Sequence, residues 1–120
     1  LMIRRPPRST LDRSSAASDV YKRQNGNGAY RFQGGGIATT TDNPTIYVYR
    51  GFTYRFNNTT AAGHPFALRQ TSGGTAVTDG VTGDQQGVQY WTVPQSLAAG
   101  TTYVYQCTMH PAMVGNLTVV

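Results

Sequence analysis

The sequence predicts an all-β protein, a sandwich of about seven short strands. The 120 residues include eight tyrosines, four phenylalanines and fourteen glycines, and they contain no glutamate. Aromatic and β-branched residues favour strands, and glycine favours the turns between them. Short alternating segments recur between turn signals, and no segment has the periodicity of a long helix. At this length the chain forms at most one domain.

The expected strands follow one another along the chain. They cover residues 29–33, 45–50, 52–57, 64–69, 88–94, 101–107 and 116–120, with a weaker strand near 76–78. The clearest alternation is in 52–57, where Phe52, Tyr54 and Phe56 point to one face and polar residues to the other. In 101–107, Tyr103 and Tyr105 share a face with the cysteine that ends the segment. Residues 95–100 are expected to hold one helical turn or only a loop.

The first 24 residues are expected to be a disordered, non-native tail, followed by a domain spanning 25–120. The segment is basic and rich in serine, and it lacks apolar periodicity and the apolar core of a secretory signal. It closely resembles a translated sequencing-adapter fragment, which implies that the native N-terminus is missing. Six cationic residues against two aspartates give it a net charge of +4, and the remaining residues carry only +1. A nucleic-acid-binding role would therefore rest on this segment alone.

The residues with metal-binding chemistry gather near the C-terminus. Cys107, His110 and Met113 lie within seven residues, and this cysteine is the only one in the chain. A thiolate, an imidazole and a thioether together favour a transition metal that tolerates sulfur, copper above all. The other histidine, His64, lies 43 residues before Cys107, where a loop re-enters a predicted strand. A sandwich can bring such a junction to the same end as the C-terminal loop.

Each of these residues also has an ordinary structural interpretation. A lone cysteine at a strand end is commonly a small buried side chain, and Met113 can fill the core. A single histidine such as His64 is more often structural than a ligand. The joint placement of the only cysteine and both histidines favours a metal site, because two histidines, one cysteine and a weak axial methionine form the blue-copper arrangement.

Residues 44–120 resemble the cupredoxins, the plastocyanin-like small blue copper proteins. The resemblance is carried by 44–58, 63–66, 91–94 and 100–113. It implies a cupredoxin-like Greek-key β-sandwich that holds one copper ion, cycling between Cu(II) and Cu(I). The implied metal ligands are His64, Cys107, His110 and Met113. Two residues between His110 and Met113 make a short ligand loop, similar to that of amicyanins.

The sequence departs from the family pattern directly after the first ligand. Many members have an asparagine there, and its side chain helps to tie the two ligand loops together. Here Pro65 occupies the position, so Thr108 is expected to lose that partner. Asn57 or Asn58 can substitute for the missing asparagine, and the sequence does not decide between them.

The resemblance implies a type 1 copper electron carrier that is not an enzyme, because no acidic residue, lysine or further histidine clusters near the ligands. It implies a transient redox protein partner reached through His110, a monomeric state, no nucleic acid, no membrane insertion, and a periplasmic or extracellular location. The alternative is a structural or adhesion module of a larger cell-surface or virion protein, with copper binding retained or lost. Copper storage or delivery also remains open at this point.

Overall fold

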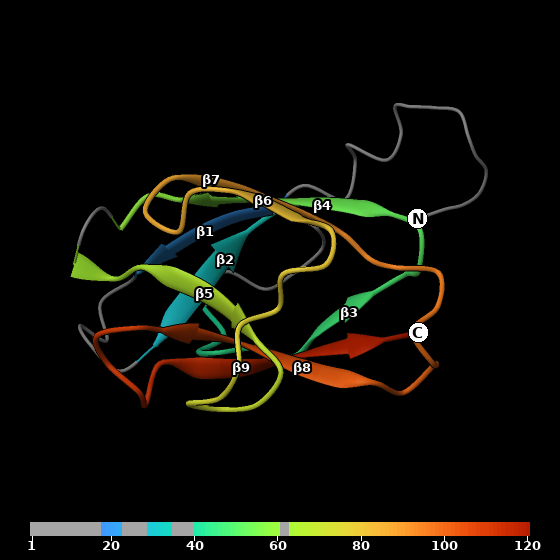
Figure 1. Ribbon diagram of the computed structural model, residues 1–120. Coiled ribbons are helices and arrows are strands. Elements are labelled where there is room, and N and C mark those ends of the chain that lie inside the picture. The colour runs from blue at the N-terminus through green and yellow to red at the C-terminus, as the bar shows by residue number, and fades with distance from the viewer. Residues whose placement is uncertain (1–17, 23–28, 35–39, 61–62) are drawn as a thin grey trace.

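The computed structural model describes residues 18–22, 29–34, 40–60 and 63–120, and these form a β-sandwich (Figure 1). The described strands are β1 (Ser18–Lys22), β2 (Tyr30–Gln33), β3 (Ile46–Val48), β4 (Thr53–Asn58), β5 (Phe66–Arg69), β6 (Val81–Gly83), β7 (Val88–Thr92), β8 (Thr102–Cys107) and β9 (Val114–Val119). One sheet has the order β2-β1-β4-β7-β6 and the other β3-β9-β8-β5. The predicted all-β sandwich is confirmed.

Neighbouring strands in each sheet are often distant in sequence. Strand β9 lies between β3, which it pairs in parallel, and β8, which it pairs antiparallel. Strand β5 pairs antiparallel with β8, from Phe66 opposite Cys107 to Arg69 opposite Val104. These crossovers are typical of Greek-key sandwiches. They also place the end of β8 directly beside the beginning of β5.

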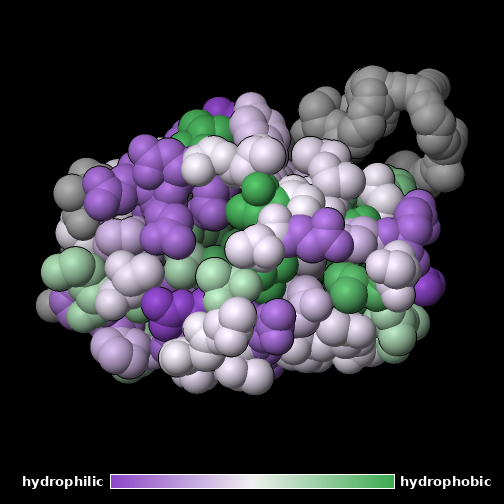
Figure 2. Space-filling view, in the orientation of Figure 1, coloured by the Kyte–Doolittle hydropathy of each residue, from purple (hydrophilic) through white to green (hydrophobic). Residues whose placement is uncertain are grey.

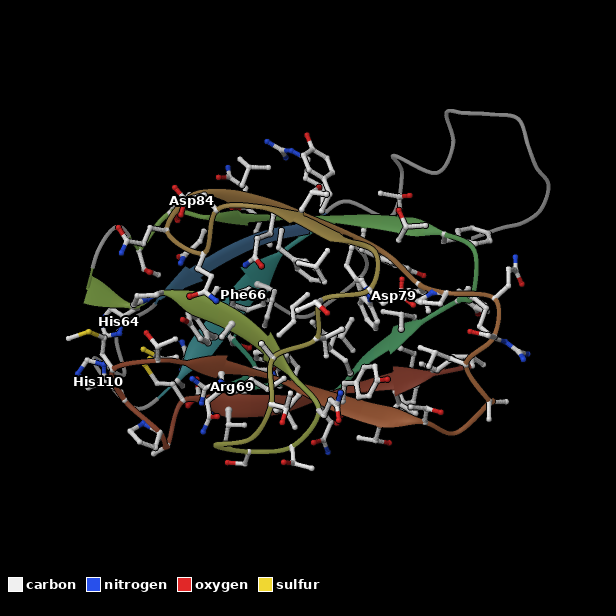
Figure 3. All side chains as sticks on the ribbon, viewed as in Figure 1. His64, Phe66, Arg69, Asp79, Asp84 and His110 are labelled. Carbon is white, nitrogen blue, oxygen red and sulfur yellow. The ribbon has the colours of Figure 1, made fainter. Side chains whose placement is uncertain are left out.

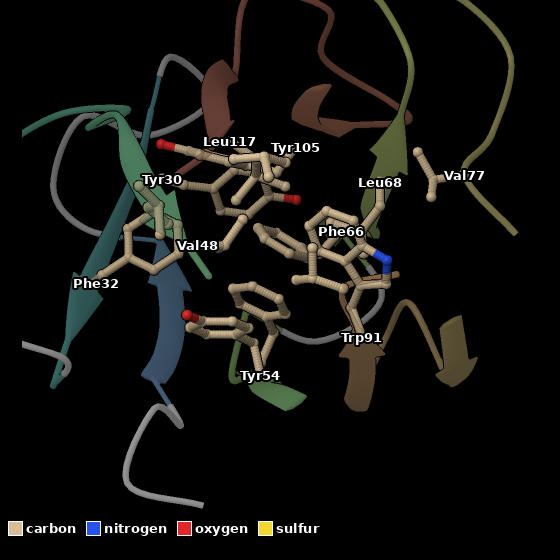
Figure 4. Packing of buried hydrophobic residues seen from close by; sticks show 14 of the residues in the cluster. Tyr30, Phe32, Val48, Tyr54, Phe66, Leu68, Val77, Trp91, Tyr105 and Leu117 are labelled. Carbon is tan, nitrogen blue, oxygen red and sulfur yellow. The ribbon is translucent and has the colours of Figure 1, made fainter. Parts of the chain in front are cut away.

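The core lies between the two sheets and is mainly aromatic (Figure 4). The expected alternation in 52–57 is confirmed, since Tyr54 and Phe56 are buried on the inner face of β4. Opposite them, Phe66 of β5 and Tyr105 of β8 stack with ring centroids 5.4 Å apart. Trp91 is fully buried and opposes Tyr54 across the β4–β7 pair. Such burial of large aromatic side chains is the main stabilising contribution in a sandwich of this size.

Some strand boundaries differ from those expected. The weak strand near 76–78 is only an isolated bridge between Arg69 and Ala76, and the short strand β6 forms a few residues later, at Val81–Gly83. The sequence does not predict that strand because Gly80 precedes it and Gly83 ends it, and both glycines, which have positive φ, indicate turns in the sequence. Residues 95–100 contain turns and no helix. Among the residues described, no helix has the length and apolar character needed to cross a bilayer.

The expected tail needs a correction. Residues Ser18–Lys22 form β1, which pairs antiparallel with β2 and in parallel with β4. The sequence does not predict this strand because these residues lack apolar alternation, but backbone pairing between two strands does not require that pattern. The rest of the segment, residues 1–17 and 23–24, lies outside the described residues. The domain boundary at residue 25 stays a prediction.

Candidate metal centre

The structure brings both histidines and the cysteine together at one end of the sandwich. Cys107 is the last residue of β8, and His64 lies two residues before β5, the strand that pairs with β8. His110 follows in the loop between β8 and β9. Figure 3 shows the side chains of His64 and His110 close together at this end, and their ring centroids are 4.7 Å apart. The potential ligand atoms of the three residues all lie within 4.8 Å of one another.

The distances within this cluster fit one metal ion. The Sγ atom of Cys107 lies 3.7 Å from Nδ1 of His64 and 3.5 Å from Nδ1 of His110. Nitrogen and sulfur ligands about 2.0–2.3 Å from a common ion, at an angle between tetrahedral and trigonal, are separated by about 3.5–3.7 Å. One thiolate and two imidazoles form a donor set that suits a single copper ion. The residues present therefore fit the metal that the sequence suggests.

Burial differs among the three side chains. Cys107 is 1% exposed and His64 is 6% exposed, whereas His110 is partly exposed. Cys107 is the only cysteine, so no disulfide within the chain competes for its sulfur. The cluster is therefore closed to solvent on the side of Cys107 and His64. His110 is the member that reaches the surface.

Met113 is fully buried and belongs to the same core cluster as Cys107. Its backbone carbonyl accepts a hydrogen bond from the amide of Cys107 at 2.9 Å, and its amide donates to the carbonyl of His110 at 2.9 Å. These two bonds close residues 107–113 into a compact loop, here called the ligand loop. They place the methionine at the base of this loop. Its role as the fourth ligand stays a prediction.

The amide of Met109 donates to Sγ of Cys107 at 3.4 Å. This contact helps to fix the position of the sulfur, and the thiolate of a cysteine is the form that binds a metal. The side chain of Met109 is 62% exposed, next to His110 on the molecular surface. The backbone amide of Met109 therefore bonds the sulfur of Cys107, while its side chain faces solvent.

The two ligand-bearing segments are tied together in spite of Pro65. The amide of Thr108 donates to the carbonyl of Pro65 at 3.2 Å, so a backbone bond joins the segments at this point. Thr108 lacks the asparagine side chain that many family members have there, and this backbone bond joins the two segments in its place. Proline lacks a side-chain amide, but its carbonyl is a good acceptor and was overlooked in the sequence.

Asn58, at the end of β4, is the asparagine that supports the His64 segment. It is 5% exposed, and its side-chain Nδ2 donates to the carbonyls of His64 at 2.8 Å and Gln85 at 2.9 Å. Its Oδ1 accepts from the amide and hydroxyl of Thr60. Of the two candidates in the sequence, Asn58 therefore fixes the backbone at His64. It binds the carbonyl of that residue and does not reach Thr108.

Tyr30 is a supporting residue that the sequence indicates only as part of the expected strand 29–33. Its hydroxyl lies 2.8 Å from the carbonyl of His64 and 3.0 Å from that of Pro65, so its one proton is shared between them. Burial raises the pKa of Tyr30 well above its ordinary value, and the nearby Cys107 side chain raises it further. The contact spans 34 residues, and no local signal in the sequence indicates it.

Comparison with solved structures gives the same fold. A copper protein, rusticyanin, matches with a TM-score of 0.50 and 24% identity, over 87% of this chain and 76% of its own. Amicyanin from Paracoccus versutus has a TM-score of 0.49 and 20% identity, over 94% of this chain and 86% of its own. An amicyanin variant in a reduced Cu(I) form has a TM-score of 0.43 and 31% identity, over 64% and 70%.

Neither a protein-family model nor a curated protein matches the sequence. The match to rusticyanin therefore supports the fold alone. The chemistry of the site follows from the residues of this chain. Two histidines and one cysteine of this chain lie in a cluster that suits a single copper ion. We therefore identify the chain as a protein of the cupredoxin fold.

Proposed function

We propose that the chain is a type 1 copper protein that carries single electrons to and from a protein partner. His64, Cys107 and His110 would hold the ion strongly, and Met113 would be the weaker axial ligand. The observation that carries this proposal is the placement of Sγ of Cys107 3.7 Å and 3.5 Å from the Nδ1 atoms of His64 and His110. Copper bound there would supply one-electron exchange between Cu(II) and Cu(I).

The surrounding residues support transfer of electrons without exchange of ligands. The ligand loop is closed by backbone bonds, and the His64 segment is held by Asn58 and Tyr30. Side chains fixed in advance rearrange little when the charge at the site changes, which lowers the barrier to electron transfer. A copper storage or delivery role needs easier exchange of the ion, and these contacts favour a carrier instead.

Electrons would enter and leave at His110, since the other two cluster residues are buried. The neighbouring side chains Met109, Pro111 and Ala112 are exposed and uncharged. Figure 2 shows that the visible face of the molecule mixes polar and apolar side chains, with no single large apolar area. A small neutral contact of this kind suits a transient redox partner better than a permanent one.

We assign no catalytic role to the site. The cluster formed by the described residues contains no carboxylate, and so it offers no acid or base beyond its own histidines. We also propose that the protein is a monomer that acts in the periplasm or outside the cell, without binding nucleic acid or inserting into a membrane. No observation favours the structural or adhesion role.

Titration of the purified full-length chain with Cu(II) tests the proposed function. We expect an intense blue thiolate-to-copper absorption band that saturates at one copper ion per chain. Cys107→Ser should abolish this band because it removes the only thiolate. Circular dichroism of that variant checks that the fold is retained. A wild-type chain that shows no band, or a Cys107→Ser variant that keeps it, would rule out the proposal.

A further inference from the structure

Gln106 is a buried amide next to the cluster that the proposed function does not use. It is 1% exposed and directly precedes Cys107 in β8. Successive side chains of a strand point to opposite faces, so Cys107 lies in the core and Gln106 on the outer face of its sheet. The turn that follows β5, residues 70–75, covers it there. A long polar side chain is rarely this buried unless its contacts require it.

All of the hydrogen-bonding capacity of the Gln106 side chain is used. Its Oε1 accepts from Nη1 of Arg69 at 2.9 Å and from the amide of Gly73 at 2.7 Å. Its Nε2 donates to Oγ of Ser72 at 3.1 Å and to the carbonyl of Pro111 at 2.9 Å. The orientation of the amide is determined by these partners. Arg69 and Gly73 only donate and the Pro111 carbonyl only accepts, so a flipped amide would lose all three bonds.

Pro111 is the residue through which this network reaches the ligand loop. It directly follows His110 and lies two residues before Met113. The backbone bonds of the ligand loop join its two ends and connect Met113 to His110, and they leave the carbonyl of Pro111 to Gln106. Figure 3 places Arg69 in the same part of the molecule as His110. Gln106 therefore links the exposed turn at Ser72 and Gly73 to the middle of the ligand loop.

We infer that Gln106 is a positioning residue that holds the ligand loop in its metal-binding conformation by anchoring Pro111 to the turn after β5. The inference rests on the proposed copper site and deepens it, because it assigns the rigidity of the loop to a side chain outside the ligand set. Partners of metal ligands commonly change metal affinity by about 10–100-fold when they are removed. Gln106 acts less directly than such a partner. It binds the backbone carbonyl of Pro111, which lies between the proposed ligands His110 and Met113.

The variant Gln106→Glu separates the bonds that the Gln106 oxygen accepts from the bonds that its nitrogen donates. A carboxylate at this position keeps an oxygen for Arg69 and Gly73 but has no proton to donate to the Pro111 carbonyl. Gln89→Glu is the matched control. Gln89 is also buried at 4% exposure, and its Nε2 donates to the carbonyl of Phe66 at 2.5 Å, in β5 and outside the ligand loop. Both variants replace one buried amide donor with a carboxylate.

Two measurements distinguish the variants. In the metal-free chain, amide hydrogen exchange at Met113 should be faster in Gln106→Glu, because the loop that protects this amide is no longer held. In the copper-loaded chain, removal of copper by a chelator should be about 10–100-fold faster, with a shifted absorption band. Gln89→Glu should lower the free energy of unfolding but leave the exchange at Met113 and the absorption band unchanged.

The outcomes separate this inference from the proposed function. If the wild type binds no copper, the proposed function fails, and the exchange measurement still tests the coupling of Gln106 to the loop. If the wild type binds copper and Gln106→Glu matches it in exchange and in copper loss, the inference is overturned. If Gln106→Glu does not fold, Arg69→Met tests the same network, since it leaves Gln106 in place and removes one donor to its Oε1. A smaller increase in both rates is then expected, and unchanged rates would overturn the inference.

Discussion

At the scale of single residues, the cluster depends on buried hydroxyl and amide groups that are not themselves ligands. Tyr30 is fully buried, and its hydroxyl meets the carbonyls of His64 and Pro65 close to the sulfur of Cys107. The side-chain amide of Asn58 donates a hydrogen bond to the same His64 carbonyl. The role of Tyr30 is evident only once the fold is known, because in the sequence it belongs to an ordinary strand, whereas Asn58 is one of two candidates that the sequence offers.

Tyr30→Phe removes one hydroxyl from this support and leaves the ring packing intact. We expect the free energy of unfolding to fall by about 1 kcal/mol, the usual net contribution of one hydrogen bond. The absorption band of the copper-loaded chain should shift, because the environment of Cys107 changes. Chemical denaturation and visible spectroscopy measure the two effects.

Tyr105→Phe is the control for this substitution. Tyr105 is equally buried, and its hydroxyl donates to the carbonyl of Pro44 at 2.5 Å, away from the cluster. Its loss should reduce stability by a similar amount without moving the absorption band. A band that is the same in Tyr30→Phe as in Tyr105→Phe would show that the Tyr30 hydroxyl is only a core contact.

At the scale of elements, strand β1 is where the sequence and the structure differ most. Residues Ser18–Lys22 carry no strand pattern, yet they lie between β2 and β4 in the five-stranded sheet. Among the strands that the structure describes, β2 pairs only with β1. Strand β2 carries Tyr30 and Phe32, two of the largest buried side chains. The pairing of β1 with β2 therefore supports the metal centre indirectly, because Tyr30 of β2 bonds the carbonyls of His64 and Pro65.

Truncation tests whether the domain needs β1. A chain that begins at residue 25 leaves β2 without a partner in its sheet, so its free energy of unfolding should be lower by at least about 2 kcal/mol, given about 1 kcal/mol for each backbone hydrogen bond lost. A chain that begins at residue 18 keeps β1 and should match the full-length chain in chemical denaturation. Equal stability of the two truncated chains would support the boundary at residue 25 and make β1 dispensable.

At the scale of the whole molecule, the aromatic core makes stability depend on pH in the alkaline range. Burial raises the pKa of Tyr54 from its ordinary value of 10.0 to about 12. Burial also raises the pKa of Tyr105 well above its ordinary value. An unfolded chain releases these phenolic protons near pH 10, while the folded chain retains them. The unfolded state therefore binds fewer protons above pH 10, and stability falls as pH rises.

We expect the midpoint of urea denaturation to be constant below about pH 9 and to fall steeply between about pH 10 and 12. The tyrosinate absorbance of the buried tyrosines should appear together with the loss of the folded circular dichroism in one cooperative step, because buried phenols ionise only when the core opens. Ionisation of all tyrosines at a pH where the circular dichroism is still that of the folded chain would contradict this account.

The sequence by itself determined the features that depend on neighbouring residues. The alternation of Tyr54 and Phe56 predicts a strand with one buried face, and the close spacing of Cys107, His110 and Met113 predicts a ligand loop, because both patterns act within one element. The position of His64 at a loop–strand junction was also readable, and the structure confirms that junction at the start of β5.

The tertiary structure decided which distant groups meet. The pairing of β5 with β8 brings His64 to Cys107 across 43 residues, and it also places the Ser72 turn over Gln106. Backbone pairing makes a strand of Ser18–Lys22, where the order of residue types in the sequence shows no strand pattern. Strand order and hydrogen bonds to backbone carbonyls leave little trace in side-chain identity, because every residue carries a carbonyl. For this reason the ligands could be proposed from the sequence, whereas Tyr30, Gln106 and the carbonyl of Pro65 required the fold.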